Sequence, residues 1–84
     1  MEDQLTFSTF MLSLSTSVLL SLGELPDPIT NEKNINLSLA KQTIGLIEML
    51  LKKTKGNLTE AEDRLVGNML YDLRMKYIEA SKNQ

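Results

Sequence analysis

The 84-residue chain contains no cysteine, no histidine and no tryptophan, and only two of its residues are proline. Without cysteine no disulfide can form, and without cysteine and histidine the usual ligands of a structural zinc site are missing. A chain of this length buries only about 60–65% of the surface that its unfolded form exposes, so its stability is marginal without a cross-link, a metal or a partner. We therefore expect homo-oligomerisation to complete the fold.

The sequence also lacks a basic excess and the common catalytic motifs. Nine basic and eleven acidic residues give a net charge of −2, which argues against a nucleic-acid partner. No hydrolase elbow, phosphate-binding glycine loop or metal-binding histidine pair is present. Asp27 lies between two prolines and could present a carboxylate, but aspartate in a turn more often bonds its own backbone. We expect no catalytic residue, no cofactor and no metal site.

A run of nineteen residues without charge, 5–23, stands near the start of the chain. Eight of these residues are serine or threonine, which is too polar for a good membrane span. No lysine or arginine precedes Lys33, whereas a secretion signal begins with positive charge. The run therefore predicts an amphipathic helix, a membrane contact is not expected, and we expect a cytoplasmic protein.

Hydrophobic periodicity and capping residues predict one all-α domain over 1–84, with helices at about 6–22, 37–54 and 60–81. Gly23 is suited to a helix C-cap, and the proline-containing segment 23–36 is expected to be an ordered loop. Asn36 is the predicted N-cap of the second helix. Thr59 and Glu62 have the spacing of a capping box at the start of the third. The expected architecture is a small three-helix bundle or hairpin arrangement.

Each helix has an apolar side that predicts the core. On the first helix the core-facing positions share one third of the circumference at 100° per residue: they are Phe7, Phe10, Met11, Leu14, Val18 and Leu22.

Two further apolar stripes lie away from the predicted core. Leu5, Leu12 and Leu19 repeat every seven residues on the first helix. Tyr71, Met75 and Ile78 lie almost opposite the core side of the third. A bundle this small cannot also bury these stripes, so we predict that they form an interface, with Arg74 contacting a carboxylate or backbone carbonyl across it. A symmetric dimer is the favoured assembly, and an unidentified protein partner is the alternative.

Several stretches together resemble one bacterial family. They are TFMLSLSTS, LGELPDPIT, LAKQTIGLIEMLLKKTKGNLT and LYDLRMKY, and they extend over about residues 5–79. The family that they resemble is domain of unknown function 1844, which consists of small uncharacterised proteins. The resemblance therefore implies no activity, substrate or cofactor.

Two functions from different classes are compatible with these observations. The preferred hypothesis is a self-associating protein-interaction or scaffold module that uses the first and third helices. The alternative is a module that binds an apolar ligand or a membrane surface through the uncharged first helix. An enzyme that uses Asp27 or a Glu/Lys pair ranks third, because it requires side chains that converge in a pocket.

Overall fold

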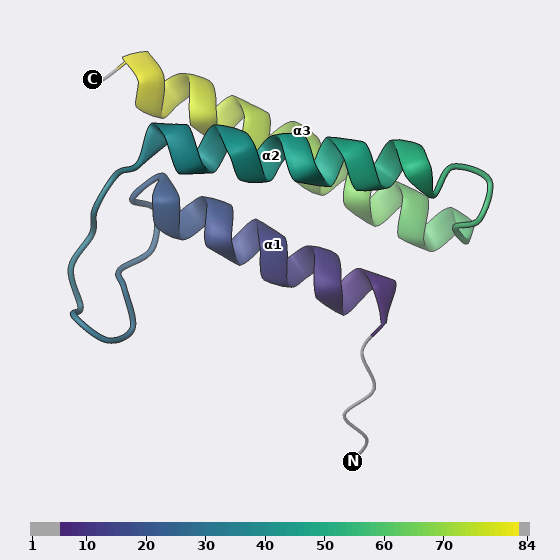
Figure 1. Ribbon diagram of the computed structural model, residues 1–84, viewed down its shortest axis with the longest axis horizontal. Coiled ribbons are helices and arrows are strands. Elements are labelled where there is room, and N and C mark those ends of the chain that lie inside the picture. The colour runs from purple at the N-terminus through teal and green to yellow at the C-terminus, as the bar shows by residue number, and fades with distance from the viewer. Residues whose placement is uncertain (1–5, 83–84) are drawn as a thin grey trace.

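The computed structural model describes residues 6–82, and these residues form three α-helices and no strand. The helices are α1 (Phe7–Ser21), α2 (Leu37–Lys53) and α3 (Glu60–Lys82). Successive helices run in opposite directions, and each of the three contacts both of the others (Figure 1). The all-helical prediction is confirmed. Each observed helix boundary lies within one residue of its expected position.

Side-chain caps fix the start of each helix. The side chain of Thr6 accepts a hydrogen bond from the Thr9 amide, and that of Asn36 accepts one from the Leu39 amide. At α3, the Glu62 amide donates to Thr59 Oγ1 at 3.1 Å, and the Thr59 amide donates to Glu62 Oε1 at 2.9 Å. The predicted Asn36 cap and the predicted capping box are therefore present.

Nine buried apolar side chains form the core, three from each helical region. They are Met11, Val18, Leu22, Ala40, Ile44, Ile47, Val66, Leu70 and Leu73. Because α1 contacts both α2 and α3, its buried side is rotated from the predicted one, and it includes Ser15 and Ser21. Phe10, which was expected in the core, is instead 39% exposed.

The loop between α1 and α2 extends to one side of the helices (Figure 1), and hydrogen bonds join its two ends and brace its centre. Leu22 and Ile35 form an isolated antiparallel bridge, and Gly23 takes the positive φ of 77° expected of a C-cap. In the middle, Asp27 Oδ1 accepts hydrogen bonds from the amides of Ile29 and Thr30 at 2.7 and 3.2 Å. The carboxylate of Asp27 therefore stabilises the turn by accepting hydrogen bonds from its backbone, as aspartate commonly does.

Candidate functional site

The apolar stripe on the outer side of α3 is the first candidate surface. Tyr71, Met75 and Ile78 are 66%, 49% and 48% exposed. We call these three residues the α3 stripe. At 100° per residue they lie about 110–175° from the centre of the buried residues Val66, Leu70 and Leu73, so the helix cannot turn them into its own core. The structure thus leaves uncovered three large apolar side chains that follow one another at helical spacing.

The predicted stripe on α1 is not continuous. Leu12 is 46% exposed, but Leu19 is half-buried and packs against the core. Leu5 lies outside the described residues. The sequence placed Leu19 away from the core, whereas in the structure it packs against the core of a bundle in which α1 contacts both other helices. Only Leu12 among the described members of this set is available to a partner.

Arg74 contacts a carboxylate of its own chain. Its Nε and Nη2 donate to Glu48 Oε2 at 3.0 and 2.7 Å, which joins α3 to α2. About half of each side chain remains exposed to solvent. A contact of Arg74 across an interface, as expected from the sequence, stays a prediction, because the observed carboxylate partner belongs to the same chain.

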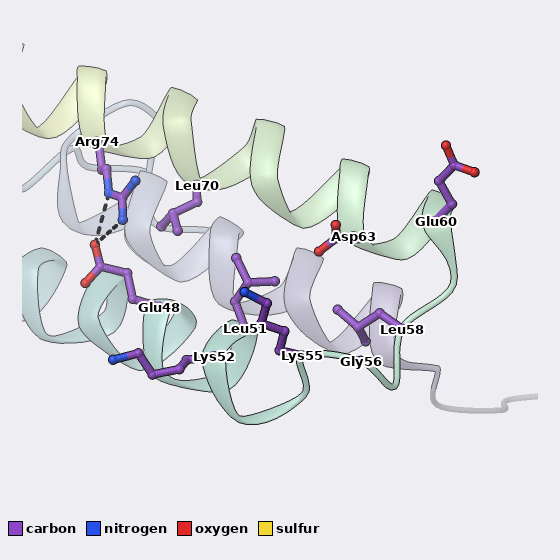
Figure 2. Close-up of a pocket in the computed structure, with 10 residues that line it drawn as sticks. All are labelled: Glu48, Leu51, Lys52, Lys55, Gly56, Leu58, Glu60, Asp63, Leu70 and Arg74. Carbon is purple, nitrogen blue, oxygen red and sulfur yellow. Dashed lines mark hydrogen bonds and ion pairs between the residues drawn. The ribbon is translucent and has the colours of Figure 1, made fainter.

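The Arg74–Glu48 pair stands at one end of a groove between α2 and α3 with a volume of about 950 Å³ (Figure 2). Three leucines line it, together with Gly56 and charged residues of both signs: Leu51, Leu58, Leu70, Lys52, Lys55, Glu60, Asp63, Glu48 and Arg74. Glu60 points away from the other lining residues (Figure 2) and pairs with Arg64 at 3.0 Å. The lining contains no serine, threonine or tyrosine, and its three acidic residues balance its three basic ones. It therefore has no hydroxyl nucleophile.

A second, smaller hollow of about 320 Å³ lies between α1 and α2. Its lining carries no charge and consists of Leu14, Ser17, Leu20, Ser21, Leu39, Thr43 and Leu46. We call this set the α1/α2 face. This face was not predicted from the sequence, although Leu39 and Leu46 repeat at a spacing of seven residues, and both side chains are exposed. That seven-residue spacing was the sequence pattern from which this face could have been predicted.

Among residues 6–82, no group of three or more aspartate and glutamate side chains lies close enough together to hold a metal ion. None of the three described helices is long and apolar enough to cross a bilayer. What the geometry offers is contact surface: one exposed stripe, one mixed-charge groove and one uncharged face.

The fold and its surfaces thus define a small three-helix protein with exposed apolar faces. Residues 4–79 match the model of the family described as domain of unknown function (DUF1844), and the chain belongs to that family. No match was found among curated proteins or solved structures. The predicted family is confirmed, and it supplies no activity that could be transferred to the surfaces.

Proposed function

We propose that this chain is a non-catalytic protein-interaction module that associates with a second copy of itself. The observation that carries the proposal is the α3 stripe. Tyrosine and methionine are enriched at protein interfaces, and apolar side chains that gather on one face mark such interfaces more often than scattered ones do. Fully burying an exposed side chain of this kind contributes about 1.5–3 kcal/mol, and these three are about half to two thirds exposed, so covering the stripe in a dimer supplies roughly half of that for each residue.

The size and composition of the chain support the same conclusion. Among residues 6–82 the core contains nine buried apolar side chains. The sequence provides no disulfide to reinforce that core. Among the remedies available to a domain this small, association adds buried apolar area without adding chain length. We therefore regard the dimer as part of what stabilises the fold.

Light scattering over a dilution series tests this proposal. The wild-type chain should have the mass of a dimer at micromolar concentration, and Met75→Glu should shift it to a monomer, because a carboxylate at this position would be buried without a partner. Ile29→Glu is the matched control, since Ile29 is 91% exposed on the loop and far along the chain from α3. A wild-type monomer, or a Met75→Glu dimer with unchanged affinity, would contradict the proposal.

Leu12→Glu separates the contribution of α1 from that of α3. If α3 provides the whole contact, Leu12→Glu should leave the dimer intact. If both helices contribute, as the sequence suggested, Leu12→Glu should also dissociate it. Circular dichroism should show that all three variants keep wild-type helix content, because each replaces an exposed residue.

A second candidate function rests on the α1/α2 face. An uncharged hollow with exposed leucines is suited to an apolar ligand or to the surface of a lipid bilayer. Co-sedimentation with neutral vesicles, and titration with an apolar fluorescent probe, test the two forms. Leu46→Glu should abolish either signal, whereas Met75→Glu should not. Absence of both signals in the wild-type chain would remove this candidate.

A further inference from the structure

We propose that two copies of the chain pair along α3 in antiparallel orientation, with the two-fold axis passing beside Tyr71. This inference rests on the proposed self-association and specifies its geometry. What supports it is the distribution of charged, apolar and glycine residues along one side of α3. That side faces solvent and not the other two helices.

The side of α3 that carries the stripe also carries charge at both ends. At 100° per residue, seven positions lie within about 40° of Tyr71 around the helix. In order they are Glu60, Arg64, Gly67, Tyr71, Met75, Ile78 and Lys82. Tyr71 is the central residue of Glu60–Lys82. An antiparallel pair centred on it therefore overlaps along the entire length of both helices.

Charge decides the direction of the pair. Residues 60–70 of α3 contain three acidic side chains and one arginine, whereas residues 72–82 contain three basic and two acidic ones. A parallel pair would place the two acidic ends together. An antiparallel pair places each acidic end beside the basic end of the second copy, with Glu60 facing Lys82, and it also opposes the two helix dipoles favourably.

Shape fixes the register. In the centred antiparallel pair, Met75 of each copy faces Gly67 of the other. A Cβ built at Gly67 would meet no atom of its own chain within 4 Å, so nothing in the monomer requires a glycine there. Glycine in a helix interior costs about 1 kcal/mol relative to alanine, and it lets a second helix approach closely. The hollow that it leaves is suited to the flexible side chain of methionine.

The remaining contacts agree with this register. The two Tyr71 rings meet at the axis, and large aromatic residues near the centre of an interface commonly dominate its energetics. Ile78 faces Arg64 of the second copy, whose aliphatic stem can cover it while the guanidinium stays in water. Arg64 already pairs with Glu60 of its own chain, so in this register Glu60 lies between two basic side chains, Arg64 of its own chain and Lys82 of the second copy.

Single-cysteine variants test the geometry directly, because the chain has no cysteine of its own. A disulfide requires Cα atoms about 4.4–6.8 Å apart, so only facing positions cross-link efficiently. Under mild oxidation, Tyr71→Cys should give a covalent dimer, whereas Met75→Cys alone should not. An equimolar mixture of Gly67→Cys and Met75→Cys chains should cross-link, although neither does so by itself. Ile29→Cys measures the background from random collisions.

Each other outcome has a distinct meaning. Cross-linking of Tyr71→Cys, Met75→Cys and Ile78→Cys each with itself would show a parallel pair and overturn the inference. Cross-linking of Met75→Cys without Tyr71→Cys would overturn the register. A dimer by light scattering with no cross-link above the Ile29→Cys background would move the interface to another face, and it would leave the proposed self-association standing. A monomer in light scattering would overturn both.

Discussion

At the scale of single residues, the ion pair between Arg74 and Glu48 shows how little an exposed charge pair adds to stability. Both side chains remain about half exposed, although the two hydrogen bonds are short. Exposed pairs of this kind contribute about 0.2–1 kcal/mol, because water screens them and two long side chains lose freedom. We therefore expect the pair to orient α2 on α3 more than to stabilise them.

A double-mutant cycle measures this contribution. Arg74→Met and Glu48→Gln should each lower the free energy of unfolding slightly, with a coupling energy of about 0.2–1 kcal/mol. Urea denaturation should be carried out in a Met75→Glu background, so that association does not contribute. A coupling energy above about 2 kcal/mol would show that the pair is effectively less solvated than its exposure indicates.

At the scale of the helices, the capping box at the start of α3 is expected to contribute more than that ion pair. Thr59→Ala removes the acceptor of the Glu62 amide, and it should lower the free energy of unfolding by about 1 kcal/mol. Thr16→Ala is the matched control. Thr16 lies within α1 and bonds the Leu12 carbonyl, so alanine there should stabilise the chain slightly. Opposite signs in thermal denaturation would support the cap, and equal signs would contradict it.

The helix ends could be predicted from the sequence because they depend on local chemistry. Asn36, Thr59 and Gly23 act on neighbours a few residues away, and such effects can be recognised without knowing the fold. The orientation of α1 could not be predicted in the same way. Which side of α1 is buried depends on α2 and α3 together, so Phe10 was wrongly assigned to the core and Leu19 to the surface.

The candidate surfaces differ in the same way: some follow from one helix alone, and others depend on how the helices pack. The exposure of the α3 stripe could be predicted because its three residues lie opposite the core residues around the same helix. The groove between α2 and α3 could not, since it depends on how the two helices pack, which brings Leu51 and Leu70 to the same lining although they are far apart in the sequence. The partner of Arg74 also required the fold, because Glu48 lies 26 residues away in sequence.

The two glycines that end α1 and α2 provide a further test at the scale of the helices. Gly23 and Gly56 both have positive φ, at 77° and 90°, which strains any other residue except asparagine and aspartate by about 1–2 kcal/mol. A Cβ at Gly23 would lie 2.9 Å from Ile35 Cγ1, whereas one at Gly56 would meet open space. Gly23→Ala should therefore lower the free energy of unfolding more than Gly56→Ala. Equal losses in urea denaturation would mean that the Ile35 side chain moves aside freely.

At the scale of the whole molecule, a small core and an uncovered α3 stripe together predict that stability depends on protein concentration. A binding partner that recognises only the folded chain raises the midpoint of thermal unfolding, and a second copy is such a partner. Each tenfold increase in concentration above the dissociation constant contributes about 1.4 kcal/mol per dimer, which corresponds to a rise of about 3–6 °C for two chains of this length.

Calorimetry at several concentrations should therefore show a rising midpoint for the wild-type chain and for Ile29→Glu, and a constant midpoint for Met75→Glu. The loop variant matters because it introduces the same carboxylate at a more exposed apolar position, so a general effect of charge on unfolding would move both variants alike. A constant midpoint in all three would mean that the nine core residues stabilise the monomer without help, and the exposed α3 stripe would then need another explanation than self-association.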